Sequence, residues 1–292
     1  MANTSLPQAR KGYVLWLDSL GPAARRLLFW VLLLIGAISF IVPFLFMLST
    51  AFKGPREQLN ASLMPQQPTL ENFSAVFNQI PIGQALLNSV FVYGTITLST
   101  LVFSSMVGYA LSRLEWTGRE FVFNIVLLTM MIPGQLLLIP LYLLIVRFGW
   151  TDSYQGLIVP ALMSTFGIFM FRQNFKTIPQ DLIDAARIDG ANELTILFRI
   201  LWPLSTPSLI TVGIFTFMGG WNDFLWPTIV NREQHLMTLT QMVTLYAIGG
   251  QAGGQFGAVM ASSLIGVLPM IVVYLVFQKW YLQGIVSTGI KG

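Results

Sequence analysis

The chain has 292 residues, of which 54% are hydrophobic and only 10% are charged, and its formal net charge is +4. A soluble domain usually carries about 25% charged residues, so lipid rather than water must surround much of this chain. The absence of cysteine excludes disulfide bonds and thiolate metal sites. The composition therefore predicts an all-α membrane protein.

Long uncharged tracts recur along the chain and predict six transmembrane helices. A spanning helix needs about 20 mostly apolar residues, and the first tract is too long for the apolar core of a signal peptide. Pro133 and Pro140 should bend the third helix, because proline removes a backbone donor. We expect the six helices at Leu27–Phe52, Ala85–Ser112, Phe121–Val146, Ser153–Phe171, Ile200–Asn222 and Gly257–Phe277.

The distribution of Lys and Arg predicts the orientation in the membrane. With the N-terminus in the cytoplasm, all of the 16 Lys and Arg residues lie inside except Lys53, Arg56, Arg147 and Arg232. The positive-inside rule therefore places both termini in the cytoplasm. This gives a cytoplasmic tail over residues 1–26, a six-helix membrane domain over 27–279 and a cytoplasmic tail over 280–292. The positive net charge is explained by topology, so no nucleic-acid partner is expected.

Several functional classes lack the residues that they need. The chain has no G-x-x-x-x-G-K-[ST] phosphate loop, and one histidine, His235, cannot build a zinc site alone. We expect no catalytic residues, no metal and no cofactor. Ion-coupled carriers usually hold a charged group inside the membrane, whereas Asp223 is expected at the outer surface. An ion-coupled secondary carrier and a membrane-embedded enzyme are therefore disfavoured alternatives.

The expected spans do contain neutral polar side chains. They either join helices through hydrogen bonds or line a path for a polar uncharged solute. The residues in question are Asn88, Tyr93, Thr95, Thr97, Ser99, Ser104 and Ser105 in the second span and Gln135 in the third.

The stretch DLIDAARIDGANELTILFRILWPLSTP, Asp181 to Pro207, gathers charge in a chain that otherwise avoids it. Pro179 suits the first turn of a helix, the aspartates that follow suit its N-terminus, and Gly190 suits its end. A second helix is expected from Ala191 to Trp202. Loops between spans are normally short, so this cytoplasmic helix–turn–helix is expected to meet a partner.

The same stretch resembles a motif of the membrane subunits of binding-protein-dependent ATP-binding cassette (ABC) importers. Their E-A-A-x-x-x-G motif stands here as Asp184-Ala185-Ala186-Arg187-Ile188-Asp189-Gly190, followed by Ala191, Phe198, Ile200, Pro203 and Pro207. Aspartate replaces the first glutamate, which keeps the charge and shortens its reach. The stretches LLNSVFVYG, MIPGQLLLIPLY, GWNDFLWP and QGIVSTGIKG resemble the carbohydrate-uptake branch, particularly its smaller maltose-type permease subunit.

This resemblance implies the type I ABC importer permease fold in a prokaryotic cytoplasmic (inner) membrane. It also implies a segment, 176–203, that couples the permease to a separate ATP-binding subunit dimer. A second, homologous permease subunit and an extracytoplasmic solute-binding protein would complete the importer. The coupling residues would be Asp184, Ala185, Ala186, Asp189, Gly190, Ala191 and Phe198.

The resemblance implies two further contacts and a solute class. The tail residues Gly284, Thr288 and Gly289 would touch the ATPase. The solute would be a sugar or a sugar-like polar molecule, although permeases for glycerol phosphate and for glycosidic osmolytes share the pattern. In the maltose system the solute contacts come mainly from the other permease subunit, so no substrate residues are assigned here. The loop that could reach the solute-binding protein contains Gly249, Gly250, Gly253 and Gly254.

Overall fold

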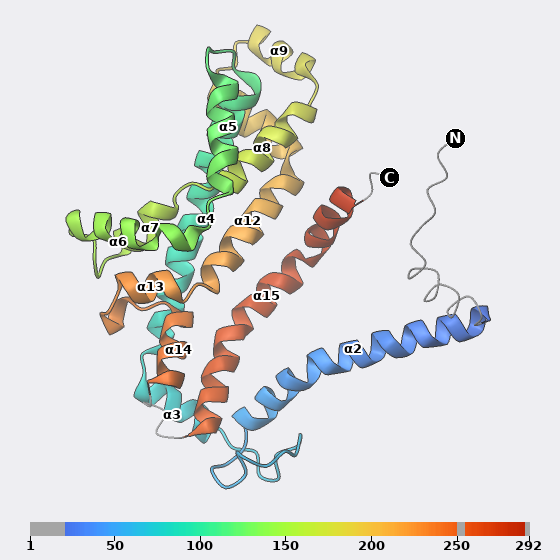
Figure 1. Ribbon diagram of the computed structural model, residues 1–292, viewed down its shortest axis with the longest axis vertical. Helices are drawn as coiled ribbons and strands as arrows, with labels where there is room; N and C mark the ends of the chain where they lie inside the picture. The colour runs from blue at the N-terminus through green and yellow to red at the C-terminus, as the bar shows by residue number, and fades with distance from the viewer. Residues whose placement is uncertain (1–20, 250–254, 290–292) are drawn as a thin grey trace, which may run out of the picture.

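The computed structural model describes residues 21–249 and 255–289, and every regular element in these ranges is helical. Four helices, α4 (Ile82–Arg113), α8 (Thr165–Thr177), α12 (Thr206–Trp221) and α15 (Phe256–Gly289), form the body (Figure 1). Helix α4 packs against both α8 and α12, and α12 packs against α15. The prediction of an all-α protein is confirmed for the part of the chain described.

Of the remaining elements, α2 has 30 residues and packs against α15, and the others are shorter than any of these four helices. Three are 3-10 helices, η1, η2 and η4, and η3 is a π-helix. The bounds of all the remaining elements are α2 Pro22–Ala51, α3 Glu71–Gln79, α5 Arg119–Met130, η1 Gly134–Leu137, α6 Leu138–Arg147, α7 Tyr154–Ile158, η2 Val159–Ala161, α9 Gln180–Ile188, α10 Glu193–Thr195, η3 Ile196–Leu201, α11 Trp202–Leu204, α13 Leu225–Val230, η4 Gln234–Leu236 and α14 Leu239–Ile248.

Within the described ranges, four helical stretches are long and apolar enough to cross a membrane. They are Pro22–Ala51, Ile82–Arg113, Tyr154–Thr177 and Phe256–Lys279. Two bent helix pairs raise the number to six if each pair forms one span. The structure thus supports four to six candidate spans in the places that hydropathy predicts.

The third expected span is not one straight helix. Helix α5 has only 12 residues, about 18 Å of helix, which is shorter than the roughly 30 Å hydrocarbon core. A 94° bend separates it from Gly134–Arg147, and Pro133 lies at this break, as expected. The expectation for Pro140 is wrong: it lies in the first turn of α6, where a missing N–H costs no intrahelical hydrogen bond.

Two helix ends differ from the expected boundaries. Helix α2 begins at Pro22, with proline in its first position, several residues before the expected start at Leu27. Helix α15 continues past Phe277 to Gly289, so the stretch from 280 onward begins as helix. Residues 1–20 and 290–292 of the expected tails lie outside the described ranges.

Small residues let α4 and α8 approach closely. A Cβ added at Gly108 would lie 2.7 Å from Cβ of Phe171. One turn earlier, the Ser104 hydroxyl donates to the Ser164 carbonyl at 3.2 Å and accepts from its N–H at 3.1 Å. Helices in lipid associate through such close packing and hydrogen bonds.

Other polar side chains of α4 also bond to neighbouring segments. Asn88 donates to the carbonyls of His235 and Met237, each at 2.9 Å, and Ser105 accepts from the indole of Trp202 at 3.0 Å. Joining helices is therefore a confirmed role of Asn88, Ser104 and Ser105.

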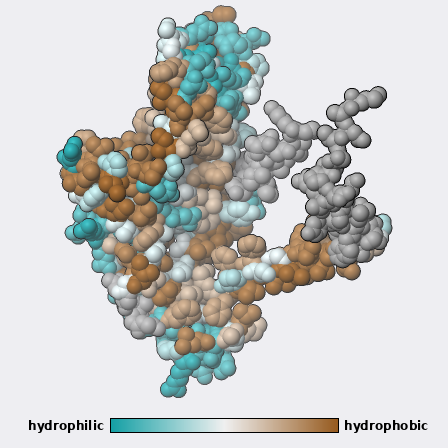
Figure 2. Space-filling model, viewed as in Figure 1, coloured by the Kyte–Doolittle hydropathy of each residue, from teal (hydrophilic) through white to brown (hydrophobic). Residues whose placement is uncertain are grey.

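Polar residues gather at the two ends of the long axis, and hydrophobic residues predominate between them (Figure 2). One end carries α9 and the other carries α3 with the loop after α2 (Figure 1). That loop folds around Lys53, whose buried ammonium donates to the carbonyls of Asn60 at 2.7 Å and Ser62 at 2.6 Å. This arrangement is typical of a protein whose apolar belt faces lipid.

The contact at Gly108 generates a stability prediction. Gly108→Ala should lower the free energy of unfolding by about 1–3 kcal/mol, because the new methyl group overlaps Phe171 and neither backbone can withdraw freely. Gly94→Ala is the matched control on the same helix, since a Cβ there meets nothing within 4 Å. Thermal unfolding of the purified protein in detergent measures both. Equal melting temperatures for the two variants would contradict the close-packing argument.

Candidate coupling site

The expected helix–turn–helix is present at one end of the molecule, where α9 lies beyond the ends of α4 and α8 (Figure 1). Pro179 precedes the first residue of α9. Gly190 has φ +82° and ends the helix: its N–H bonds to the Arg187 carbonyl at 3.0 Å, and the Ala191 N–H bonds to the Ala186 carbonyl at 2.9 Å. These two bonds form a Schellman motif, so the assigned role of Gly190 as a helix terminator is confirmed.

The second helical part begins later than expected and is not a regular α-helix. The Asn192 side chain caps it by accepting from the Thr195 N–H at 2.8 Å, so it begins at Glu193 rather than Ala191. The π-helix η3 follows α10, and such turns often mark functional sites. After α11 the chain bends by 88° into α12. The coupling segment is therefore joined to α12 through a sharp corner at Ser205.

The seven residues expected to couple to a partner differ in exposure. Ala186 is only 8% exposed and packs into the core at this end, together with Ile183 and Phe175. Its small side chain thus lets α9 lie close to its own core. Asp184, Ala185, Asp189 and Gly190 are exposed, and Ala191 and Phe198 are half-buried.

Three exposed apolar residues near these positions were not singled out from the sequence. Ile188 is 86% exposed, Leu194 is 55% exposed and Leu182 is 46% exposed. Leu182, Ala185 and Ile188 are spaced three apart and share one side of α9. The available signal was that the apolar residues of α9 cover more of its circumference than the strip that a surface helix buries against its own core.

Hydrogen bonds connect the coupling segment to the end of α4. The Tyr109 hydroxyl donates to Glu193, which also accepts from Nε of Arg187 at 3.1 Å. This hydrogen bond raises the pKa of Arg187. Burial favours neutral Glu193, but its bonds to Tyr109 and Arg187 outweigh burial and lower its pKa. Both groups therefore stay charged. Asp184 lies 3.5 Å from Arg187 in the same network.

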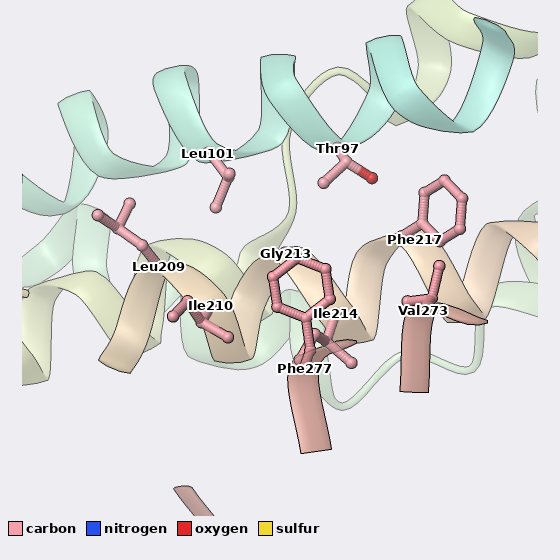
Figure 3. A pocket seen from close by; sticks show the side chains of 9 residues that line it. All are labelled: Thr97, Leu101, Leu209, Ile210, Gly213, Ile214, Phe217, Val273 and Phe277. Atoms are coloured by element: carbon pink, nitrogen blue, oxygen red, sulfur yellow. The ribbon is translucent and has the colours of Figure 1, made fainter. Parts of the chain in front are cut away.

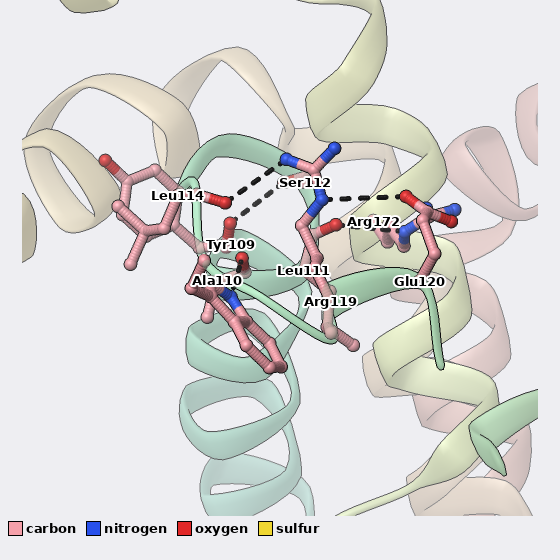
Figure 4. A network of polar contacts seen from close by, with 9 residues as sticks. Tyr109, Ala110, Leu111, Ser112, Leu114, Arg119, Glu120 and Arg172 are labelled. Carbon is pink, nitrogen blue, oxygen red and sulfur yellow. Dashed lines mark hydrogen bonds and ion pairs between the residues drawn. The ribbon is translucent and has the colours of Figure 1, made fainter. Parts of the chain in front are cut away.

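Two further arginines fix the end of α8. Arg113 of α4 donates to the carbonyls of Phe175 and Ile178 at the C-terminal end of α8. Arg172 is 3% exposed; its Nη2 donates to both oxygens of Glu120 at 2.7 and 2.8 Å, and its Nε donates to the Leu111 carbonyl at 3.1 Å (Figure 4). The buried cation thus has the partners that burial requires.

The other expected contact residues lie far from α9 in the sequence. Gly249 follows the last residue of α14, while Gly250, Gly253 and Gly254 lie outside the described residues. Gly284, Thr288 and Gly289 belong to the last turns of α15. His235 lies in an exposed turn, 3.9 Å from Glu233. Among the described residues, no cluster of three or more His, Cys, Asp or Glu could hold a metal ion.

An apolar groove of about 350 Å³ lies between α4, α12 and α15 (Figure 3). Among the described residues that line it, the only polar side chain is Thr97, whose hydroxyl already donates to the Tyr93 carbonyl at 2.7 Å. A groove of this kind offers a polar solute no hydrogen bonds and suits lipid chains or a helix surface instead.

Comparison with known proteins defines the class. The chain is 36% identical over 238 residues to an arabinooligosaccharide transport permease of Bacillus subtilis, covering 81% of this chain and 84% of that protein. It is 32% identical over 261 residues to a diacetylchitobiose uptake permease of Streptomyces coelicolor, covering 88% and 86%. It is also 34% identical over 211 residues to an sn-glycerol-3-phosphate permease of Pectobacterium atrosepticum, covering 72% and 75%.

The fold agrees with these relatives. It superposes with a TM-score of 0.81 on a chain of a bacterial ABC transporter involved in the import of the acidic polysaccharide alginate, at 24% identity, covering 90% of this chain and 99% of that one. The fold and the relatives define a multi-pass membrane permease. Residues 100–286 match the family of binding-protein-dependent transport system inner membrane components, and the chain belongs to this family. It is a transport component of the cytoplasmic membrane.

The bond between Tyr109 and Glu193 generates a second prediction. Tyr109→Phe removes the hydroxyl that joins the coupling segment to α4, so the amides of α9 and α10 should exchange with deuterium faster, by about threefold or more, as expected from the loss of one hydrogen bond to a charged group. Hydrogen exchange with mass spectrometry checks this. Tyr142→Phe on α6 is the control and should change nothing in α9. Unchanged exchange in the Tyr109 variant would show that the bond does not restrain the segment.

Proposed function

We propose that this chain forms half of the translocation pathway of a binding-protein-dependent ABC importer for a sugar or sugar-like polar solute. A homologous permease subunit, an ATP-binding subunit dimer and an extracytoplasmic solute-binding protein complete the importer. Family membership supports the role, and the sugar class is supported by relatives named for arabinooligosaccharide and diacetylchitobiose uptake. A glycerol-phosphate permease among the relatives favours the alternative solute.

The observation that carries the coupling role is the exposed apolar side of α9. Leu182, Ala185 and Ile188 face outward at the tip of a charged end, and an exposed apolar patch with a polar rim is typical of a protein interface. The partner is the ATPase, which hydrolyses ATP while this chain does not. The Asp184 carboxylate beside the patch is 52% exposed despite its contact with Arg187, so it remains available to a cation of the partner.

The positive charges near α9 support an orientation of the protein in the membrane. Six cations lie in α9 or in the turns and helix ends next to it, whereas Lys53 and Arg56 lie at the opposite end. The positive-inside rule places the α9 end in the cytoplasm, with six spans and both termini inside. The six cations are Arg113, Arg119, Arg172, Lys176, Arg187 and Arg199.

Two contacts complete the proposal. The loop that contains Gly249, Gly250, Gly253 and Gly254 reaches the solute-binding protein outside the membrane. The end of α15, with Gly284, Thr288 and Gly289, touches the ATPase inside. Helix α15 supports this assignment because it runs from the α3 end toward the α9 end (Figure 1).

The orientation can be tested cleanly because the chain has no cysteine. Leu59→Cys should react with a membrane-impermeant maleimide in intact cells, and Asp189→Cys should react only after permeabilisation. Both positions are exposed, so labelling reports the side of the membrane. The reverse pattern would invert the topology and place α9 where no ATPase can reach it.

The coupling role predicts the effect of a charge on the exposed side of α9. Ile188→Asp should reduce co-purification of the ATPase and coupled uptake by about tenfold or more, as expected when a central apolar contact is lost. The fold should remain intact because Ile188 is 86% exposed. Leu59→Asp is the matched control: it alters a leucine that is 87% exposed at the opposite end. Normal ATPase assembly with the Ile188 variant would refute the assignment.

A further inference from the structure

A second cavity, of about 430 Å³, lies between α4, α12, the connection from α7 to α8, and the start of α13. This volume is within the roughly 300–1,000 Å³ typical of small-molecule sites. Its mouth lies beside Met163, Phe215 and Gly219, which are exposed. A Cβ added at Gly219 would meet nothing within 4 Å, so the missing side chain leaves the space open.

The walls of this cavity carry hydrogen-bonding groups that the protein itself does not use. Asp223 accepts from the N–H groups of Leu225 at 2.9 Å and Trp226 at 3.3 Å, but both bonds go to Oδ1. Within the described residues, Oδ2 accepts no hydrogen bond, and the hydroxyls of Thr165 and Thr216 are bonded to no other group. These three polar groups are therefore free to bind a solute.

The remaining walls are aromatic and held in place. The Trp226 indole donates to the Gly156 carbonyl at 3.2 Å, which fixes its ring at the cavity wall. Tyr93, only 4% exposed, forms another part of the wall. Rigid aromatic surfaces provide apolar contact area, and the few polar groups set orientation. A sugar presents both kinds of surface, because its ring carries hydroxyl groups at the edge and C–H groups on the face.

The charge of the cavity excludes one of the two solute classes. In the part of the chain that the structure describes, Asp223 is the only charged residue that lines it, and no Lys, Arg or His does. Burial raises the pKa of Asp223, and bonds from the Trp226 and Leu225 N–H groups oppose this shift. In either protonation state the carboxyl group binds hydroxyls, whereas a phosphate or carboxylate finds no cation to replace its lost hydration.

We propose that this cavity is a solute-binding subsite that selects neutral polyhydroxyl solutes over phosphorylated or carboxylated ones. The recognising groups are Thr165, Thr216 and Asp223, with Tyr93 and Trp226 as the flat walls. The proposal rests on the proposed function, because a solute reaches this cavity only if the chain lines a translocation pathway. It assigns direct solute contact to this subunit and decides between its two candidate solute classes.

The test uses the complete importer, expressed with its partner subunits in cells that lack other uptake systems for the probes. The probes are labelled arabinotriose, N,N′-diacetylchitobiose and sn-glycerol 3-phosphate. Two variants alter the cavity. Asp223→Asn keeps an oxygen for the N–H groups of Leu225 and Trp226 but loses the carboxylate, and Gly219→Leu fills the open space. Asn222→Ala is the control, since its exposed side chain bonds only to the Met218 carbonyl and lines no part of the cavity.

The expected result is uptake of a neutral sugar but not of glycerol 3-phosphate. Uptake should fall about tenfold or more in both cavity variants, as expected for a lost hydrogen bond to a charged group or a filled site, while ATPase assembly and the Asn222 control stay normal. Sugar uptake at the wild-type rate in both variants would overturn the subsite alone. Preferred uptake of glycerol 3-phosphate would overturn the selectivity. Failure of the wild-type chain to assemble with an ATPase would instead overturn the proposed function, and the subsite with it.

Discussion

The close contact between α4 and α8 fixes the frame on which both functional regions depend. Lipid provides no hydrophobic force between helices, so the approach at Gly108 and Phe171 and the paired hydrogen bonds of Ser104 and Ser164 must hold them together. The end of α8 is then tied to Arg113. Helix α4 therefore positions the α9 end of the molecule, while its other half, through Tyr93, lines the cavity that we propose as a solute subsite.

Helix α12 provides the mechanical connection between these regions. Its first residues follow the 88° corner at Ser205, and its last turns carry Thr216 and Gly219 of the cavity. A helix of 16 residues is about 24 Å long, so α12 extends from the corner to the cavity. On the proposed function, we expect a force applied to α9 by the ATPase to reach the cavity wall through this corner. Small movements at one end of a packed element produce discrete rearrangements at the other in this way.

The sequence predicted most of what local patterns determine. Hydropathy placed the apolar helices, and Gly190 marked the end of α9, because span length and helix termination depend on neighbouring residues alone. The sequence predicted a bend in the third span but not its size of 94°, since a proline can also cause only a mild kink. The burial of Ala186 and the placement of Asp223 in a cavity could not be predicted. Both depend on which helices meet, and no local pattern encodes this.

The features that identify the family say little about the solute. Relatives at nearly equal identity are named for arabinooligosaccharides, diacetylchitobiose and sn-glycerol 3-phosphate, so membership of the family does not by itself distinguish these solutes. Specificity is a difference between two binding free energies, and a few wall residues are enough to set it. A phosphate loses its hydration when it enters a cavity lined by one carboxyl group and no cation, and no protein group compensates for this loss. A sugar hydroxyl instead replaces its hydrogen bond to water with one to the carboxyl group. The proposed subsite therefore assigns solute choice to the residues around Asp223 and separates it from the exposed side of α9, where we propose that the ATPase binds.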